Sequence, residues 1–469
     1  MPDKIQDKMK GLPAEYAEEL LPTIRKQFMK SGKTIVVLDD DPTGTQTSYD
    51  VTVLTDWKVD LLIEELKKKP SILFILTNSR SLHEAAAVQL AFEIGHNLKQ
   101  AVKASGREII ALSRSDSTLR GHFPAEVDAL GQALDIRDAV TVLLPAFIEG
   151  GRYTLNDVHY IKEGEELIPV ADTPFARDAV FGYHHSNLKE WVEEKSKGRI
   201  TAEEVISLSL EDIRLGGPER VHGKLSTCTP GQVCIVNACS VRDLEVFVMG
   251  LLLAGQSKQK FIFRTSATLV TIMAGMAPGK RLHPPKHEAP TNGALVIVGS
   301  YVPKTTSQLE YLLKQGSHHA IEINVGAILQ SQANGGYADA IIKETDRLIT
   351  SGKDVIIYTS RKLETGKDAE NSLRINGMVS SFLVNILRGI TVRPAFIVAK
   401  GGITSSDLAS KGLGAEKAMI LGQILAGIPV WQMSEKSKFP DITYVVFPGN
   451  VGDDMALADV CQKLKGSMH

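Results

Sequence analysis

Short apolar runs, each followed by a polar loop and then by a helical segment, recur along this chain and constrain its fold more than any other feature. In the N-terminal part the runs lie at residues 34–38, 71–76, 108–112 and 139–144. They are rich in Val, Ile and Leu, which is typical of strands buried within a sheet. The repeated order of strand, loop and helix predicts a parallel sheet with helices packed on it, and therefore an α/β fold.

A second series of apolar runs follows the segment PGKRLHPPKHEAPTNG at 278–293, which is rich in proline and basic residues and is typical of a linker. The runs of this series lie at 294–298, 320–325, 354–358 and 396–399. A chain of 469 residues is also longer than one hydrophobic core usually supports. We therefore predict two α/β domains with largely parallel sheets and with the active site in the cleft between them.

The predicted domains span residues 1–285 and residues 286–469. Residues 13–30 have helical spacing that is interrupted by a proline, and they predict an N-terminal helical extension of the first domain. Residues 151–230 are less regular, and their first part predicts loops and short strands, in the manner of a hairpin insertion.

Composition excludes several classes of protein. The net charge of -2 gives no general attraction for nucleic acid or for an anionic membrane. The chain has no apolar signal core and no apolar run of about 18 residues, so we expect a cytoplasmic protein without a membrane span. Four scattered cysteines match neither a disulfide framework nor a zinc site. The oligomeric state is not readable from the sequence, and a homo-oligomer stays an open option.

Three consecutive carboxylates, Asp39, Asp40 and Asp41, directly follow the first apolar run and precede a turn at Pro42–Gly44. In an open α/β sheet, ligands bind just beyond the carboxyl ends of the strands, so these acids are candidate site residues. Their plain structural alternative is an Asp-rich turn that caps a helix. Because three adjacent acids repel one another, they need a metal, hydroxyl groups or arginines as partners.

Two further strand ends carry polar side chains, Asn78 and Arg80 after the second run, and Arg114, Asp116 and Arg120 after the third. Several such loops at one edge of a sheet are typical of a site for a polar substrate. A guanidinium group matches a carboxylate bidentately, so the arginines predict an anionic group on that substrate.

The stretch KGGITSSD at 400–407 runs from a predicted strand through two glycines into residues that favour helix N-caps. Glycines allow backbone N–H groups to approach a ligand closely, and a helix N-terminus favours an anion, so the stretch is a candidate phosphate site. An ordinary helix start is the alternative. A second glycine-punctuated loop lies at 447–454. Two stretches similar to a Walker A loop, which end at Thr34 and Thr305, each lack one of the required glycines.

Five motifs in this order resemble those of the four-carbon acid sugar kinases over nearly the whole chain. They are Asp40–Gly44, Asp116–Gly121, Gly299-Ser300, Lys400–Thr404 and Pro448–Gly452. The resemblance implies an N-terminal domain that binds a sugar acid and a C-terminal domain that binds ATP. It also implies transfer of the γ-phosphoryl group of ATP to the terminal hydroxyl of threonate, erythronate or a 3-oxo-tetronate.

The same resemblance implies roles for individual residues. The candidates for the sugar-acid pocket are Asp40, Asp41, Asn78, Arg80, Arg114, Asp116, Ser117 and Thr118. The candidates for the nucleotide site are Ser300, Ser360, Gly401, Gly402, Ile403, Thr404 and Gly449. The N-terminal extension and residues 151–200 depart from many shorter members of the family, and the second departure leaves the identity of the sugar acid open.

The implied mechanism uses ATP and Mg²⁺, with no metal-binding residue assigned. Phosphoryl transfer depends mainly on positioning and charge neutralisation. Asp40 or Asp41 would accept the proton of the attacking hydroxyl, and Arg80 or Arg114 would bind the substrate carboxylate. Two alternatives stay open: a haloacid-dehalogenase-like sugar phosphatase with Asp39 as its nucleophile, and a non-catalytic sugar-acid-binding protein.

Overall fold

The chain divides into two compact units, and the second of them includes one short segment from the N-terminal part of the chain. In the computed structural model, which describes residues 3–254, 259–277, 279, 282, 291–330, 336–361 and 369–466, the first unit contains Met1–Asp40 and Asp56–Pro278. The second contains Asp41–Thr55 and Gly279–His469. The boundary predicted between residues 285 and 286 lies outside the described residues. This N-terminal segment of the second unit, Asp41–Thr55, begins in the middle of the acidic motif.

The first unit is built on a parallel sheet, as predicted. Its strands are β2 (Thr34–Asp39), β4 (Ile72–Leu76), β5 (Ile109–Arg114), β6 (Val140–Leu144), β10 (Ile206–Leu208), β11 (Val233–Val236) and β12 (Phe261–Thr265). They lie in the order β10-β11-β6-β12-β5-β2-β4, and neighbouring strands run parallel. Every residue of β2 and of β4 is buried. Because both faces of these strands are covered, their sequences are nearly unbroken apolar runs.

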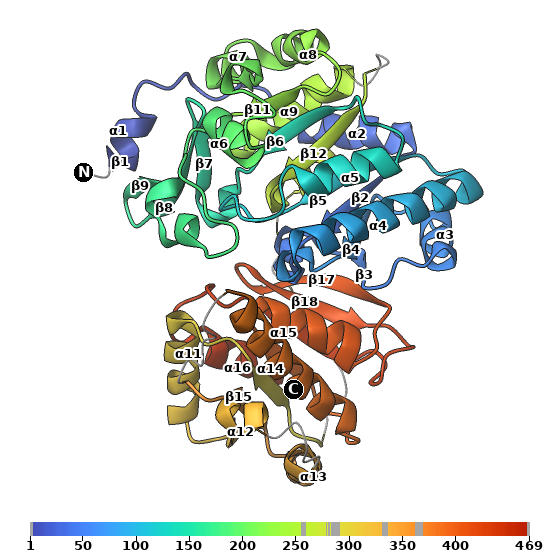
Figure 1. Cartoon of the computed structure of the whole chain (residues 1–469), viewed down its shortest axis with the longest axis vertical. Coiled ribbons are helices and arrows are strands. Elements are labelled where there is room, and N and C mark those ends of the chain that lie inside the picture. Colours follow the sequence, from blue (N-terminus) through green and yellow to red (C-terminus); the bar gives the residue numbers. More distant parts are fainter. Residues whose placement is uncertain are drawn as a thin grey trace. The chain divides into compact units, whose positions relative to one another are not determined.

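Helices cover both faces of this sheet (Figure 1). Helices α4 (Glu84–Ser105) and α5 (Ala125–Ala133) connect β4 to β5 and β5 to β6, whereas α9 (Val241–Ala254) connects β11 to β12 in the opposite direction along the sheet. Right-handed crossovers that run in opposite directions put their helices on opposite faces. The other helices of the unit are α1 (Ile5–Met9), α2 (Leu21–Ser31), α3 (Val59–Lys67), α6 (Leu188–Lys195), α7 (Leu210–Arg214), α8 (Gly217–Thr227) and α10 (Ala267–Met273).

The N-terminal extension differs from the prediction. A helix was expected over residues 13–30, but α2 begins only at Leu21, with Pro22 in its first turn. Proline lacks a backbone N–H group and is tolerated in the first turn of a helix, where that group has no partner. Pro22 therefore marks the start of the helix and does not interrupt it.

Residues 151–200 contain the predicted hairpin insertion. Strands β7 (Arg152–Leu155), β8 (Val158–Glu163) and β9 (Glu166–Pro169) form an antiparallel sheet, and β1 (Asp3–Lys4) pairs with β9. Asn156 and Asp157 form the turn between β7 and β8, and both have positive φ angles, 48° and 67°. Two consecutive positive φ angles are the requirement of the tight turn that matches the twist of a hairpin.

The second unit also contains a parallel sheet, extended by antiparallel strands. Its strands are β3 (Val51–Leu54), β13 (Leu295–Val298), β14 (His319–Ile323), β15 (Val355–Thr359), β16 (Ile397–Lys400), β17 (Lys417–Leu425), β18 (Ile428–Met433) and β19 (Thr443–Phe447). The order is β3-β17-β18-β19-β16-β13-β15-β14, parallel from β19 to β14 and antiparallel from β3 to β19. The four predicted strands are confirmed, whereas the antiparallel part was not predicted.

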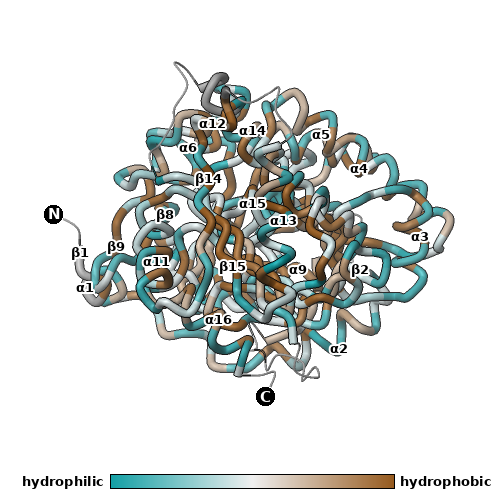
Figure 2. Tube along the Cα trace, turned by 90° about the horizontal axis from the view of Figure 1, so that it is seen from below, coloured by the Kyte–Doolittle hydropathy of each residue, from teal (hydrophilic) through white to brown (hydrophobic). Residues whose placement is uncertain are grey.

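The helices of the second unit pack in pairs. Helices α11 (Pro303–Lys314) and α16 (Ala456–Gly466) contact each other, and so do α13 (Gly336–Thr350) and α14 (Ala369–Gly389). Helices α12 (Val325–Gln330) and α15 (Gly402–Asp407) are short. In Figure 2 the trace of β15 is strongly hydrophobic, and helices α3 and α4 alternate between hydrophilic and hydrophobic residues. No helix in the described part of the chain is long and apolar enough to cross a membrane.

Candidate functional site

The three consecutive acids of the first motif have different environments. Asp39 ends β2 with its side chain fully buried, and its Oδ1 lies 2.9 Å from Arg114 Nη1. The same guanidinium nitrogen lies 3.7 Å from Asp40 Oδ1. Buried carboxylates need a cation close by, and Arg114, which is itself buried, supplies it. The third acid, Asp41, belongs to the second unit.

Asp40 is enclosed by the loop that follows β5. The hydroxyl of Ser115 donates a hydrogen bond to Asp40 Oδ2 at 2.5 Å, and Asp40 is only 3% exposed. Gly121 covers this contact with a φ of +127°, and a Cβ there would lie 2.5 Å from Ser115 Oγ and 3.3 Å from Asp40 Oδ2. Only a glycine allows the backbone to approach this closely in that conformation. This close approach explains why the last residue of the predicted Asp116–Gly121 motif is a glycine.

Asp116 lies among cations in the same loop. Arg120 Nε is 2.7 Å from Asp116 Oδ2, and Arg80 Nη1 is 3.5 Å from Asp116 Oδ1. Burial alone would raise the pKa of the Asp116 carboxyl, but the two arginines and the hydroxyl of Thr118 outweigh it and hold the pKa well below its usual range. Asp116 is therefore ionised at neutral pH. Asn78, at the end of β4, has a left-handed backbone with φ 51°.

Arg264 is a central residue of this loop cluster that was not predicted from the sequence. It lies at the end of β12 and donates hydrogen bonds to the carbonyl oxygens of Asp116 at 2.9 Å and Arg120 at 3.0 Å, and to Ser115 Oγ at 3.2 Å. Burial lowers the pKa of Arg264 to about 10, so the group stays charged at neutral pH. Its position at a strand end was the available signal, because the same reasoning indicated Arg80 and Arg114.

Residues of the hairpin insertion donate hydrogen bonds to the backbone of the predicted substrate loop. His159 Nε2 donates to the carbonyl of Ser117 at 2.8 Å, and the hydroxyl of Tyr183 donates to the carbonyl of Thr118 at 2.7 Å. Burial lowers the pKa of His159 to about 4, so the ring is neutral. Because a carbonyl oxygen can only accept, Nε2 carries the proton and Nδ1 accepts from Thr154 Oγ1 at 2.9 Å. Ser117 and Thr118 are consequently buried and held in place.

A small polar cavity adjoins Asp40 in the first unit, lined among others by Thr77, Ser79, Arg114 and Glu126. Burial raises the pKa of the Glu126 carboxyl to about 7, and the charge of Asp40 adds to the shift, although a hydrogen bond with Ser79 opposes it. Glu126 is thus largely protonated below neutral pH in the folded protein.

This shift predicts a pH-dependent stability. Since a glutamate in the unfolded chain keeps its ordinary pKa of 4.5, the unfolded chain ionises first as the pH rises, and the free energy of unfolding falls between about pH 4.5 and pH 7. Relative to wild type, Glu126→Gln should be more stable by about 1–3 kcal/mol at pH 8 and by much less at pH 4. Urea unfolding at both pH values measures the difference. Exposed Glu219→Gln is the control, and an equal gain at both pH values would contradict the assignment.

In the second unit, Asp41 caps the short 3₁₀-helix Pro42–Thr47. Its Oδ1 accepts a hydrogen bond from the backbone N–H of Thr43 at 2.9 Å. This is the capping role that the sequence also suggested. The 3₁₀-helix packs on the antiparallel strands, where Trp431 Nε1 donates to Thr45 Oγ1 at 3.2 Å.

A pocket lies at the carboxyl ends of β13, β15 and β16, entirely within the second unit. Most of the residues predicted for the nucleotide line it, namely Ser300, Ser360, Gly401, Gly402, Ile403 and Thr404. The remaining candidate, Gly449, lies beside Ser300, since a Cβ at 449 would be 3.1 Å from Ser300 Oγ. The strand ends that bring these loops together are those where ligands bind in open α/β sheets.

Three glycines of this pocket, Gly299, Gly401 and Gly402, form a glycine cradle in which loops approach one another closely. A Cβ at Gly299 would lie 2.2 Å from Thr404 Oγ1, and one at Gly401, where φ is +120°, would lie 3.0 Å from Ser300 Cβ. A Cβ at Gly402 would lie 2.7 Å from Asp41 Oδ2. The acidic motif and the glycine motif, which are far apart in the sequence, therefore meet at Asp41 and Gly402.

The helix at this site begins earlier than predicted. Thr404, Ser405, Ser406 and Asp407 were expected as N-caps, but α15 begins at Gly402 with Gly401 as its N-cap, so the four residues lie inside the helix. The hydroxyl of Ser405 bonds the carbonyls of Ala399 and Gly401, both at 2.7 Å. This back-bonding keeps a hydroxyl residue within the helix, where it does not cap the terminus.

Lys400, the first residue of the glycine motif, is buried and not available to a ligand. Its Nζ donates to the carbonyl of Pro448 at 2.6 Å and lies 3.4 Å from the carbonyl of Gly449. Burial, with Lys304 nearby, lowers the pKa of Lys400 to about 6, so the amine is largely neutral at neutral pH. Lys400 ties the loop at 448–449 to the loop at 401–402, a role that was not predicted from the sequence.

A metal ion at this site would have few protein ligands. In the described part of the chain, no three His, Cys, Asp or Glu side chains converge on one point. A Mg²⁺ ion on nucleotide phosphates needs only one or two carboxylates, because it keeps several waters. The described residues that line the pocket include no carboxylate, so such an ion would be held mainly by the phosphates and by water. His184 and His185 pair with Glu194 and Glu190.

Comparison with known families matches two adjoining models. Residues 35–273 match a family described as a sugar-binding N-terminal domain, and residues 295–457 match one described as a nucleotide-binding C-terminal domain. The first match contains Asp40, Asp116 and Arg264, and the second contains Gly299, Gly402 and Gly449.

Two relatives of known description are similar over part of the chain. A D-erythronate kinase of Heliobacterium modesticaldum is 22% identical over 64% of this chain and 65% of its own length. A D-threonate kinase of Bordetella bronchiseptica is 31% identical over 32% of this chain and 36% of its own length. The chain thus spans less than two thirds of either relative in these matches.

Solved structures share the fold. A Haemophilus influenzae protein has a TM-score of 0.61 at 17% identity, with 92% of this chain and 100% of that chain covered. A Salmonella typhimurium protein has a TM-score of 0.66 at 16% identity, with 91% and 98% covered. At such identities the likeness extends to the fold alone.

Proposed function

Because this chain belongs to the family in which a sugar-binding N-terminal domain precedes a nucleotide-binding C-terminal domain, the architecture of the four-carbon acid sugar kinases, we propose that it is an ATP-dependent sugar-acid kinase. The substrate class is a four-carbon acid such as threonate, erythronate or a 3-oxo-tetronate, and the acceptor is its terminal hydroxyl. The observation that carries the proposal is the contact of Asp41 with the glycine cradle at Gly402.

The glycine cradle supports the nucleotide half of the proposal. At Gly299, Gly401 and Gly402 a Cβ would strike a neighbouring atom at 3.0 Å or less. Gly299 and Gly401 donate their own backbone N–H groups to the carbonyls of Lys400 at 3.2 Å and Phe447 at 2.8 Å, so these glycines shape the pocket by letting its loops approach one another closely. The phosphates of ATP would lie against Gly401 and Gly402, with the hydroxyl of Ser300 beside them.

The arginines around Asp116 support the sugar-acid half. Arg80 and Arg120 flank its carboxylate, and Arg264 bonds its backbone carbonyl. The positive charge suits a substrate carboxylate, which a guanidinium binds through paired hydrogen bonds. Both Arg80 and Arg114 pair with carboxylates, but Arg114 is the weaker candidate because its side chain is only 5% exposed, whereas that of Arg80 is 18% exposed. We assign the substrate carboxylate to Arg80.

We assign Asp41 as the general base, which accepts the proton of the attacking hydroxyl. This carboxylate lies beside the cradle, whereas Asp40 is enclosed by Ser115 and Gly121. A general base must come within hydrogen-bond distance of the proton that it accepts, and an enclosed carboxylate cannot reach a sugar. Asp40 instead holds the loop that carries Asp116. Mg²⁺ on the phosphates would supply charge neutralisation there, and this chain's own residues would position the two substrates.

The phosphatase alternative is disfavoured by the surroundings of Asp39. A nucleophilic carboxylate has to reach a phosphorus atom, but Asp39 is fully buried and paired with Arg114. A panel of four-carbon sugar acids, with ADP release followed by a coupled assay, tests the kinase. ADP formed in a substrate-dependent manner is the expected result. Hydrolysis of a sugar phosphate, without ADP release from any acid of the panel, would refute it.

Arg80 offers a test of the substrate site. Removing its charge in Arg80→Met should raise the KM for the sugar acid about 10- to 100-fold, because a charge-assisted contact to the carboxylate is lost. The KM for ATP should stay within about twofold, since the nucleotide lies elsewhere. Steady-state kinetics with each substrate varied in turn measures both values. Arg199→Met, which removes an exposed ion pair with Asp128, is the control. An unchanged KM for every acid would exclude Arg80.

A further inference from the structure

Arg80, to which we assign the substrate carboxylate, lies in a single 3₁₀ turn, Ser79–Ser81, between β4 and α4. Two backbone hydrogen bonds close the turn, from the N–H groups of Ser81 and Leu82, at 3.1 and 2.9 Å. One helical turn fixes several dihedral angles for few hydrogen bonds and is not stable by itself. The position of Arg80 therefore depends on partners outside the turn.

His122, in the loop after β5, is such a partner. Its Nε2 lies 3.2 Å from the carbonyl oxygen of Ser79, before Arg80, and 3.0 Å from that of Leu82, after it. Both oxygens can only accept, so Nε2 carries the proton and shares it between them. Burial lowers the pKa of the His122 ring, which is therefore neutral at neutral pH and donates through Nε2 alone.

The ring of His122 is itself held by packing. His122 is only 5% exposed, and the ring of Phe181 meets it edge-on, with the two centroids 4.9 Å apart. Phe181 belongs to residues 151–200, the region that departs from many shorter members of the family. The backbone carbonyl of His122 accepts from the N–H of Glu126 at 3.0 Å. The imidazole is therefore fixed against the turn.

The loop that carries His122 also carries Asp116, and the two residues contact the turn at different points. Asp116 Oδ1 lies 3.5 Å from Arg80 Nη1, whereas His122 contacts the backbone on both sides of Arg80. A long arginine side chain has many rotamers, so an ion pair at its tip does not by itself fix its backbone. The contact with His122 supplies that second constraint.

We propose that His122 is a positioning residue for the sugar acid: by holding the backbone on both sides of Arg80, its Nε2–H sets where the guanidinium meets the substrate carboxylate. The inference rests on the proposed function, because it takes Arg80 as the residue that binds the acid. A guanidinium binds a carboxylate through two parallel hydrogen bonds, and a small displacement weakens both. Because His122 acts through Arg80, its contribution should vanish when the guanidinium is absent.

Calorimetric titration of the full chain with the panel of four-carbon sugar acids, erythronate and threonate among them, tests the proposal. His122→Phe keeps a ring against Phe181 but removes the N–H, so the Kd of the acid should rise about tenfold or more. His122→Gln places an amide N–H as many bonds from the backbone as Nε2, so its Kd should stay within about threefold of wild type. In His122→Asn the amide is one bond shorter, and its Kd should match that of His122→Phe.

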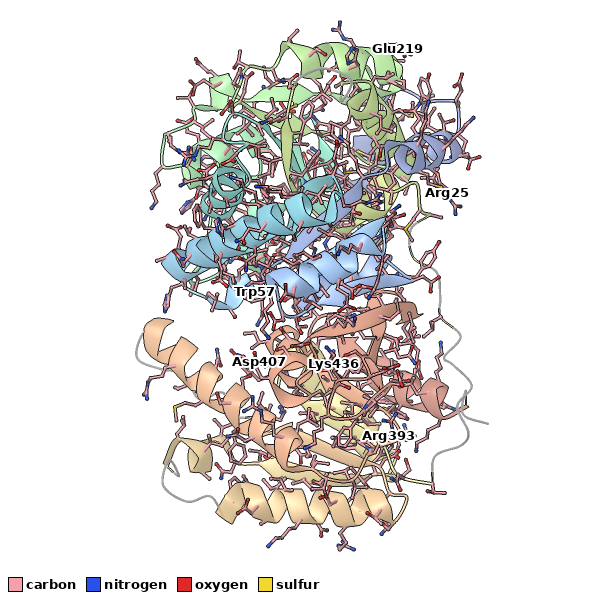
Figure 3. All side chains as sticks on the ribbon, turned by 90° about the vertical axis from the view of Figure 1, so that its right-hand side faces the viewer. Arg25, Trp57, Glu219, Arg393, Asp407 and Lys436 are labelled. Carbon is pink, nitrogen blue, oxygen red and sulfur yellow. The ribbon has the colours of Figure 1, made fainter. Side chains whose placement is uncertain are left out.

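A double-mutant cycle separates positioning from a general loss of structure. In an Arg80→Met background, His122→Phe should change the Kd of the acid by less than about twofold, because the group that it positions is gone. Trp57→Phe is the matched control, since it also removes a ring N–H, which donates to Glu93 Oε1 at 2.8 Å (Trp57 is labelled in Figure 3). This control should keep the wild-type Kd.

The outcomes separate this inference from the function on which it rests. An equal rise in Kd for His122→Phe with and without Arg80, or an unchanged Kd in both His122→Phe and His122→Asn, would overturn the positioning role. Binding without ADP release would refute the kinase, and the Kd comparison would still decide the role of His122. Binding of no acid of the panel by wild type would overturn both. If His122→Phe fails to fold, the comparison of His122→Asn with His122→Gln, two amides of different reach, decides the matter.

Discussion

Replacement of Asp41 by asparagine is expected to lower kcat by about 100- to 10,000-fold, which is the usual contribution of a general base. Asparagine keeps the size of the side chain and can still cap the 3₁₀-helix through its carbonyl oxygen, so the fold should persist. The amide cannot accept the proton of the sugar hydroxyl at neutral pH. The affinity for ADP should not decrease, because removal of a negative charge beside the phosphates cannot weaken their binding.

Rapid-quench measurement of a single turnover, combined with ADP titration, separates these two effects. Asp50→Asn is a matched control within the same segment, Asp41–Thr55. Asp50 is exposed with a positive φ of 53°, a conformation that asparagine also tolerates, so its kcat should equal that of wild type. A kcat for Asp41→Asn within about tenfold of wild type would remove the residue from the proton transfer.

Asp40→Asn should differ from Asp41→Asn because it should lower the stability of the fold as well as the rate. It removes one of the two charges that Arg114 balances and weakens the contact with Ser115, so we expect a lower free energy of unfolding in addition to any loss of rate. Thermal unfolding of the two variants side by side distinguishes an enclosed positioning residue from an accessible base.

Substitution of Gly402 is the second change with a large expected effect. In Gly402→Ala the new methyl group would lie 2.7 Å from Asp41 Oδ2, so the carboxylate must move. We expect kcat to fall at least about tenfold, since a displaced base loses its geometry with the hydroxyl. Gly402→Val should also raise the KM for ATP, because its larger side chain would occupy the space of the phosphates.

A double-mutant cycle makes this test specific. If Gly402→Ala acts by displacing Asp41, it should cost little in an Asp41→Asn background, and the coupling between the two changes should be about 1–3 kcal/mol. Gly223→Ala on α8 is the control, because nothing lies within 4 Å of its Cβ position and it should leave kcat unchanged. Additive effects of Gly402→Ala and Asp41→Asn would contradict the contact as the cause.

Local patterns predicted the elements of this fold well. The apolar runs at 34–38 and 71–76 became buried parallel strands because residues buried on both faces of a sheet must all be apolar. The antiparallel part of the second unit was missed. It contains β3, whose partner β17 is more than 360 residues away, and such a pairing leaves no periodic signal near either strand.

The site was predicted in part for the same reason. Strand ends and glycines are local features, so the amino-acid sequence was enough to indicate Arg80, Asp116, Gly401 and Gly402. Arg264 was not predicted, because it acquires its role through a partner distant in the sequence. Arg264 donates a hydrogen bond to the carbonyl oxygen of Asp116, from which it is separated by 148 residues in the sequence.

The amino-acid order alone establishes two α/β halves, the strand ends that carry polar groups and the positions where the backbone must be glycine, because these follow from hydrophobic periodicity and from the steric limits of single residues. The division of labour among neighbouring acids depends on folding. Asp40 and Asp41 are adjacent and chemically identical, yet one is enclosed in the first unit and the other lies against Gly402 in the second. Burial, approach of cations and access to a ligand are properties of the three-dimensional surroundings, which no local pattern encodes.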